Sequence, residues 1–180
     1  MNISKLIFFP KSPDKIIKTQ VLLQSLIASE FIIGDAHKNN HYLPAERFLK
    51  LITFLGCSPN INLFPVKGEN HCFISFIKPS EQTVCVGHTS TVNPKCPICT
   101  KRIANWKKTS WTLAGEMCCC DKCQQQTLYA ELNWKQECGF ARCGFEVNHI
   151  YPHEAVPTDK LLNLLNQVSG FDWDYCYTNN

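Results

Sequence analysis

The chain has 180 residues, a formal net charge of +3 and a hydrophobic content of 44%. This length and composition suit one domain, or one domain with a small inserted module, and provide enough apolar residues for a substantial core. The low net charge excludes a protein that binds nucleic acid over its whole surface, because such domains are clearly basic.

The N-terminal region predicts a strand followed by a helix. The apolar run 3–9 is rich in residues that favour strands. Ser12 and Pro13 then form a plausible helix start, with the serine as N-cap and the proline in the first turn. Apolar residues recur near helical spacing out to about Ser29, so we expect the helix to end there.

A polar loop and a second helix are expected next. The stretch 34–41 is polar and predicts the loop. Pro44 predicts the start of the helix, since the apolar residues of 48–55 recur at i, i+3, i+4 and i+7. Gly56 is the expected C-cap.

Two hairpins are predicted in the second half of the chain. The runs 71–77 and 83–88 are rich in β-branched and aromatic residues and flank a short polar turn. The alternating run 127–134 and the run 139–150 predict the second hairpin, after the cysteine-rich stretch.

The C-terminal region predicts a helix and a final strand. The helix begins near Thr158, runs through an amphipathic segment and stops at Gly170. A short strand over 173–177 follows it. The complete pattern predicts an α+β fold, with a mixed sheet, about three helices on one face and an inserted module.

Four cysteines form the most specific motif of the chain. Cys96 and Cys99 make one Cys-x2-Cys pair, and Cys120 and Cys123 make a second pair after a stretch of intervening chain. Each pair places two thiolates on one tight turn, and two such turns supply the four soft ligands of a closed tetrahedral metal site.

This motif resembles the knuckles of the zinc-ribbon group over about 93–126, including the proline inside the first pair. The resemblance implies a structural Zn2+ ion in a module of residues 93–126, inserted into an α+β domain of residues 1–92 and 127–180. It says nothing specific about function. Thr100 and Gln124 depart from the commonest knuckle, in which glycine often follows the second cysteine.

Two alternatives concern the metal and its ligands. Iron also suits four thiolates. Cys119 would replace Cys120 if the second pair shifted by one residue, and Cys118 is a further thiol beside it. Thiolates next to a metal are also the reactive form, so oxidation that releases the metal is a second interpretation of this cluster.

The loop 101–111 combines basic charge with two tryptophans. Cations can contact phosphates while indoles stack on unpaired bases, which predicts binding of single-stranded nucleic acid. The alternative is that the indoles pack the module against the main domain while the lysines are solvated, and we favour it. The candidate contact residues are Lys101, Arg102, Trp106, Lys107, Lys108 and Trp111.

The loop His149–Glu154 is a candidate for catalysis. It ends a predicted strand and contains two imidazoles and a carboxylate, which could serve as an acid/base pair or as a second metal site. Ordinary surface histidines are the favoured interpretation. No phosphate-binding glycine loop or nucleophile motif occurs, so we favour a protein without catalytic activity and keep an enzyme that uses this loop as the alternative.

The expected location is the cytoplasm. The N-terminal apolar stretch is too short for a signal-peptide core, and no run reaches the length of a membrane span. Twelve cysteines could also indicate a secreted disulfide framework, but the paired spacings favour thiolates on a metal in a reducing compartment. We therefore expect a zinc-containing adaptor that binds another protein, with single-stranded nucleic acid as the alternative partner and no membrane.

Overall fold

The computed structural model describes residues 4–37, 40–56, 61–67, 69–88, 92–107, 111–151 and 153–179. Within these ranges there are three α-helices: α1 (Thr19–Ala28), α2 (Phe48–Leu51) and α3 (Asp159–Ser169). A short 3-10 helix, η2, spans Tyr129–Glu131. The strands are β1 (Ser4–Pro10), β2 (Ile32–His37), β3 (His41–Pro44), β4 (Ile52–Phe54), β5 (Phe73–Ile77), β6 (Val84–His88), β7 (Met117–Cys119), β8 (Gln126–Leu128), β9 (Cys138–Ala141), β10 (Gly144–Asn148), β11 (Ala155–Pro157) and β12 (Trp173–Asn179).

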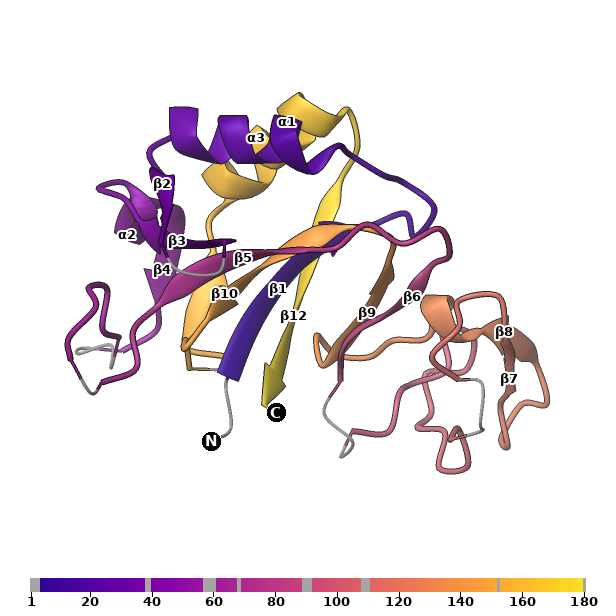
Figure 1. The fold of residues 1–180 in the computed structure, drawn as a ribbon. Helices are drawn as coiled ribbons and strands as arrows, with labels where there is room; N and C mark the ends of the chain where they lie inside the picture. The colour runs from indigo at the N-terminus through magenta and orange to yellow at the C-terminus, as the bar shows by residue number, and fades with distance from the viewer. Residues whose placement is uncertain are drawn as a thin grey trace.

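A six-stranded sheet with the order β12-β1-β10-β5-β3-β2 forms the centre of the fold. Helices α1 and α3 lie together over one of its faces (Figure 1). Every strand pair in the described ranges is antiparallel, whereas the sequence predicts a mixed sheet. The fold is therefore α+β and dominated by its sheets.

Alternation along the central strand β1 produces two cores. Leu6 and Phe8 point toward the helices and join the largest hydrophobic cluster. Ile7 and Phe9 point to the other face, where they pack against Val86 of β6 and its neighbours. Successive residues of a strand face opposite sides, so one strand is buried on both faces.

A long bent ribbon connects the sheet to the cysteine-rich part of the chain. Strand β5 pairs with β10. Strand β6, which follows β5 in the sequence, pairs with β9, which precedes β10. At the bend the backbone N–H of Ser80 donates to the carbonyl of Arg142 at 2.8 Å. The far half of the ribbon therefore folds under the sheet, opposite the helices, and carries the segment between β6 and β9 at its end (Figure 1).

Both predicted hairpins are consequently wrong. The runs 71–77 and 83–88 contain strands, but these strands pair with β10 and β9 rather than with each other. The run 127–134 contains only the short strand β8 followed by η2, and β8 pairs with β7. The strand propensity of the residues located most of the strands. The strands with which they pair are distant in sequence, and local patterns carry no information about this pairing.

The first predicted helix begins later than expected. Ser12 lies in a turn, because its carbonyl accepts a hydrogen bond from the backbone N–H of Lys15 at 3.1 Å. The helix starts at Thr19, and its N-cap residue Lys18 makes no side-chain capping bond. The predicted polar loop 34–41 is also incorrect in part, since β2 and β3 pair across it, while residues 38–39 lie outside the described ranges.

The second predicted helix is reduced to a single turn. Helix α2 ends at Leu51, and β4 begins at the next residue and pairs with β11. The Leu51 carbonyl accepts from both the N–H and the hydroxyl of Thr158, and the N–H of Leu55 donates to the carbonyl of Glu154. The pairing of β4 with β11 thus uses the backbone carbonyl and N–H groups that a longer helix would need. Gly56 is therefore not a helix cap.

The last helix agrees with the sequence. The hydroxyl of Thr158 accepts from the N–H of Leu161, as an N-cap does, and Gly170 adopts a left-handed φ of 77° at the C-cap. Strand β12 then returns along β1, from Pro10 opposite Trp173 to Ser4 opposite Asn179.

Candidate metal centre

The two cysteine pairs form two turns with the same backbone hydrogen bonds. In each turn the N–H of the first cysteine donates to a carbonyl five residues later. The residue after the second cysteine donates back to the carbonyl of the first. The bonds of the first turn are Cys96 N–H to Lys101 O, 2.9 Å, and Thr100 N–H to Cys96 O, 3.0 Å; those of the second are Cys120 N–H to Gln125 O, 2.9 Å, and Gln124 N–H to Cys120 O, 2.9 Å.

Thr100 and Gln124 close these turns in the left-handed conformation. Their φ angles are 61° and 60°, in the region that favours glycine. The absence of glycine after each pair therefore does not open the turn. Both residues adopt the conformation that glycine would take, at the steric cost of a side chain.

The four sulfur atoms fit a tetrahedral ion. The Sγ–Sγ distance is 3.7 Å between Cys96 and Cys123 and also between Cys99 and Cys120, and all four atoms lie within 4.8 Å of one another. A zinc–sulfur bond of about 2.3 Å in a regular tetrahedron places the sulfurs about 3.8 Å apart. The four cysteines could therefore hold a metal ion.

Backbone groups around the second turn favour the thiolate. The N–H groups of Cys123 and Lys122 lower the pKa of the Cys120 thiol to about 7. For Cys123 the N–H of Gln125 acts in the same direction, but burial and the neighbouring thiols outweigh it and raise the pKa to about 12. A cation placed among four such thiols would favour their deprotonated forms.

Cys118 and Cys119 lie outside this group. Cys118 is 1% exposed and packs beside Tyr129, whose pKa is raised to about 12 by burial and by that thiol. Cys119 is exposed, with its sulfur 3.8 Å from the carbonyl of Gln124. Alternation along β7 explains the difference, because adjacent residues of the strand face opposite sides.

A tryptophan cluster forms the core beside the four cysteines. Trp106 lies edge to face with Trp111 and with Trp134, at centroid distances of 5.0 Å in both cases. The indole N–H of Trp106 donates to Asn93, and its backbone carbonyl accepts from the Tyr129 hydroxyl. Trp106 is 1% exposed, so its faces are not accessible to a stacked base, and its role is packing.

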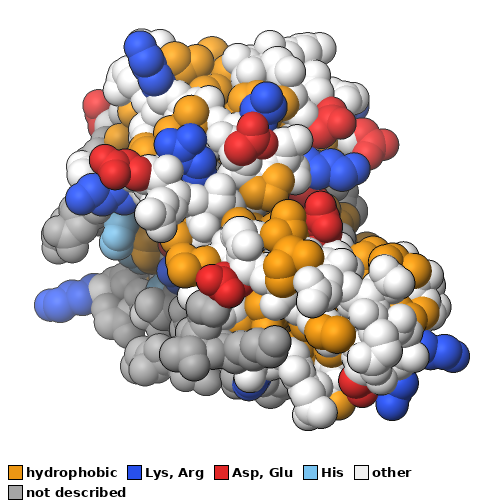
Figure 2. Space-filling model, turned by 90° about the vertical axis from the view of Figure 1, so that its right-hand side faces the viewer, with side chains coloured by type: hydrophobic (Ala, Val, Ile, Leu, Met, Phe, Trp, Pro, Cys, Tyr) orange, Lys and Arg blue, Asp and Glu red, His pale blue; other side chains and the backbone are white. Residues whose placement is uncertain are grey.

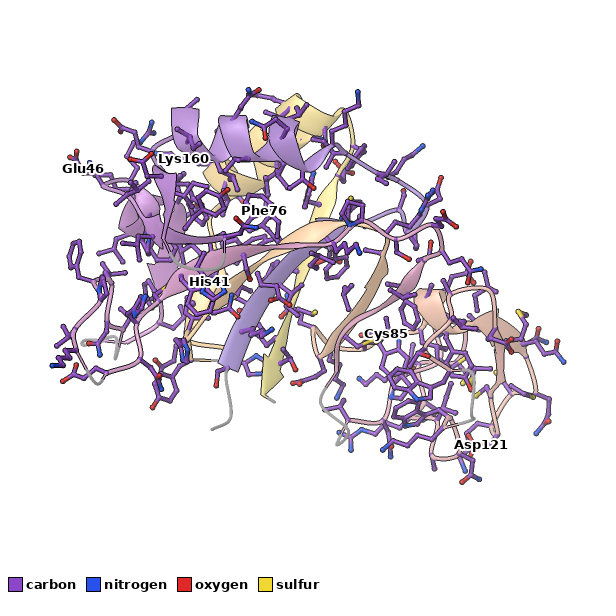
Figure 3. All side chains as sticks on the ribbon, in the orientation of Figure 1. His41, Glu46, Phe76, Cys85, Asp121 and Lys160 are labelled. Atoms are coloured by element: carbon purple, nitrogen blue, oxygen red, sulfur yellow. The ribbon has the colours of Figure 1, made fainter. Side chains whose placement is uncertain are left out.

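The basic residues of the loop 101–111 lie around this core. Lys101 and Arg102 are exposed. The Nζ atom of Lys107 lies 5.3 Å from the centre of the Trp106 ring, a cation–π contact. Lys108 lies outside the described residues. Asp121, labelled in Figure 3, lies in the second turn and pairs with Lys122 at 3.4 Å, which adds a negative charge to this part of the surface.

The histidines of the loop His149–Glu154 make different contacts. His149 lies edge to face with Phe73, and its pKa is lowered by burial and by His71 and Lys5. His153 contacts Glu137, with 3.2 Å between Nε2 and Oε1, and lies against Tyr177. Among the described residues the two imidazoles thus contact different side chains, and the carboxylate partner of His153 comes from outside the loop.

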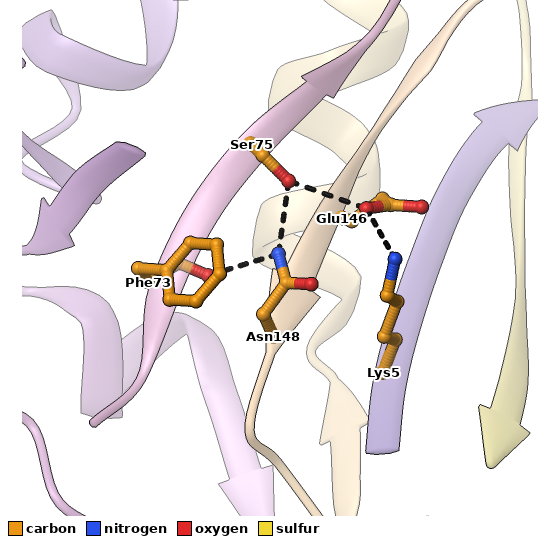
Figure 4. Close-up of polar contacts among 5 residues, drawn as sticks. All are labelled: Lys5, Phe73, Ser75, Glu146 and Asn148. Carbon is orange, nitrogen blue, oxygen red and sulfur yellow. Dashed lines mark hydrogen bonds and ion pairs between the residues drawn. The ribbon is translucent and has the colours of Figure 1, made fainter. Parts of the chain in front are cut away.

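Strand pairing assembles a polar group that local sequence patterns do not predict. The carboxylate of Glu146 accepts from Lys5 at 2.9 Å and from Ser75 at 3.2 Å, and the amide of Asn148 donates to Ser75 at 2.9 Å (Figure 4). His41 stacks on Phe73 close by, at 3.9 Å between ring centres. The residues come from β1, β3, β5 and β10, and only the order of strands in the sheet reveals their proximity.

Comparisons with protein-family models, with curated proteins and with solved structures found no match to this chain. The geometry of the site therefore carries the functional argument. Among the described residues, the four cysteines are the one group of three or more metal-ligating side chains close enough to share an ion. None of the helices in those ranges is long and apolar enough to cross a membrane.

Proposed function

We propose that the chain binds one zinc ion through Cys96, Cys99, Cys120 and Cys123, and that the ion stabilises a module that binds another protein. The observation that carries the metal assignment is the match between the sulfur separations and a zinc–thiolate tetrahedron. Four thiolates would fill the coordination sphere and leave no position for a substrate. The proposed ion is therefore structural rather than catalytic.

Zinc would contribute directly to folding in this part of the chain. The hydrophobic cluster around the cysteines is smaller than the cluster beneath α1 and α3, and two of the metal-site cysteines, Cys96 and Cys120, are among its buried members. Binding free energy at a site that does not exist in the unfolded chain becomes folding free energy. Metal removal should unfold this cluster and leave the six-stranded sheet folded.

Metal analysis of the purified protein tests the assignment. We expect one zinc per chain, loss of zinc in Cys99→Ser, and retention in the matched control Cys143→Ser, which removes a buried thiol outside the group. Stoichiometric zinc in the Cys99→Ser protein would contradict the ligand assignment. One iron per chain, with no zinc, would instead support the iron alternative, because four thiolates also suit iron.

Exposed apolar side chains support a protein partner. Figure 2 shows hydrophobic side chains on the face of the molecule that carries β7 and β8. Ile98, Leu113 and Met117 are 60%, 40% and 42% exposed. Burial of apolar surface is the main favourable contribution to protein association. The packed position of Trp106, in contrast, leaves Trp111 as the one of the two tryptophans in the loop 101–111 that is partly exposed.

Paired binding measurements test the partner class. A protein recovered with the intact chain should be lost with Met117→Lys, while that variant keeps its zinc. A control substitution at the exposed Ile33 of β2, far from the module in sequence, should leave binding unchanged. Tight binding of a mixed-sequence single-stranded oligonucleotide at low salt, weakening as salt rises, would overturn the assignment in favour of nucleic acid.

The division into a domain of residues 1–92 plus 127–180 and a module of residues 93–126 is part of this proposal. The location follows from the same chemistry, because thiolate ligands persist in a reducing compartment such as the cytoplasm.

A further inference from the structure

A second pair of sulfur atoms lies close together at the base of the cysteine-rich segment. The Sγ atoms of Cys85 on β6 and Cys138 on β9 are 3.1 Å apart. Neither residue belongs to the group of four metal-site cysteines. The side chain of Cys85, labelled in Figure 3, packs against the tryptophan-containing cluster, of which Cys138 is a buried member.

A β-bulge lies beside the two thiols. Cys85 pairs with Phe140, two residues from Cys138, so the two cysteines are diagonal neighbours on one face of the ribbon. Diagonal Cβ atoms are normally too far apart for a disulfide, which requires about 3.5–4.5 Å between them. The register shifts between Val86 and His88, and Gly87 between them has a φ of 66°. This irregularity lies next to the two thiols, whose sulfur atoms are 3.1 Å apart.

We propose that Cys85 and Cys138 are a dithiol site that closes to a disulfide in reaction with a hydroperoxide. The sulfur of Cys85 attacks the terminal peroxide oxygen, the O–O bond breaks, and the product is a sulfenic acid on Cys85 and one water or alcohol. The sulfur of Cys138 then attacks the sulfur of Cys85, the S–S bond forms, and the hydroxyl leaves as water with the proton of the second thiol. The two thiols lose two electrons and two protons, and the peroxide receives both.

The surroundings assign an order to the two steps. Cys85 is partly exposed, whereas Cys138 is 6% exposed. The hydrogen bond with Cys85, together with burial, raises the pKa of the Cys138 thiol far above its usual value. Burial therefore shelters Cys138 from the oxidant while Cys85 reacts first, and the sulfurs need to approach by only about 1 Å to reach bonding distance.

The disulfide would close the whole segment 86–137 into a covalent loop. This segment contains both metal-binding turns, and the bond would join its two ends where they leave the ribbon. A cross-link that closes a long loop restricts the unfolded chain strongly. Oxidation should therefore raise the midpoint of thermal unfolding of the segment, by roughly 5–10 °C.

Peptide mapping of the full-length, metal-loaded protein tests the proposal without any substitution. Hydrogen peroxide should remove two hydrogen atoms from this pair of thiols, in addition to any oxygen gained at the exposed Cys119, with the metal retained. Digestion without reductant, by trypsin and a glutamate-specific protease, isolates each thiol in a fragment with one cysteine: Cys85 in 82–95 and Cys138 in 138–142. We expect these two fragments to be linked, and dithiothreitol to separate them.

Variants and an internal reference show how the absence of a linked pair of fragments is to be interpreted. The exposed thiol of Cys119 reports that the oxidant has reached the protein. If Cys119 is oxidised while 82–95 and 138–142 remain separate, the proposal is refuted. Cys85→Ser and Cys138→Ser should each abolish the loss of two hydrogens, whereas Cys143→Ser should preserve it. A bridge that persists in Cys85→Ser, or one that joins fragment 82–95 to the fragment of Cys176, would equally overturn it.

Discussion

Replacing Thr100 by glycine should strengthen the metal site, although glycine usually weakens folded structure. Thr100 is exposed and holds a φ of 61° at the end of the first cysteine turn. A left-handed residue with a Cβ atom costs roughly 1–2 kcal/mol. Glycine removes that cost but loses about 0.5–1 kcal/mol more backbone entropy on folding. The difference is a gain of about 0.5–1 kcal/mol, or about a two- to fivefold increase in metal affinity.

Competition with a chromophoric chelator measures this affinity directly. Thr112→Gly provides the matched control, since Thr112 is also exposed but is not among the residues with positive φ. There the same substitution brings only the entropic loss and should lower stability by about 0.5–1 kcal/mol. If Thr100→Gly lowers the metal affinity, glycine brings only its entropic loss at this position too. The left-handed turn would then not be strained, and the reasoning would fail.

Three further substitutions test the fold. Gly139→Ala would place a Cβ atom inside the ring of Phe9, so we expect a loss of about 1–3 kcal/mol in the free energy of unfolding, measured in urea; an unchanged midpoint would contradict the close packing of β9 under the sheet. Thr158→Ala removes the N-cap of α3 and the hydroxyl bond to the end of α2, and should cost about 1–2 kcal/mol in the same assay. The pKa of His149 is lowered in the folded state, so the unfolded chain binds its proton first and stability should fall as the pH drops below about 6.5. His149→Gln should flatten that dependence, and an unchanged pH profile would show that His149 is not the responsible group.

Local signals in the sequence predicted the features that depend on neighbouring residues. The capping threonine and glycine placed α3, and the two Cys-x2-Cys pairs predicted thiols that the structure brings together. Both depend on chemistry within a few residues of chain. The turns also show that a pattern can persist when a residue type departs from it, since Thr100 adopts the conformation of the missing glycine.

Features that depend on distant partners were not predictable in the same way. The apolar spacing of 48–55 is helical, yet pairing of β4 with β11 ends the helix at Leu51. The hairpin signals failed because β5 and β6 belong to one strand path that changes sheets at a bend. The proximity of Cys85 to Cys138 follows from that ribbon, and a single sequence contains no local sign of it.

The bent ribbon also has a consequence for the order of folding. Strands β6 and β9 are separated by a long stretch of chain, and closing a loop of this length before any contact forms is entropically costly and slow. A metal ion that joins Cys96 to Cys123 would shorten the part of this loop that remains to be closed. Metal binding would then be an early step that brings β6 and β9 close to each other. The ion would affect the rate at which these strands pair, as well as the stability of the folded protein.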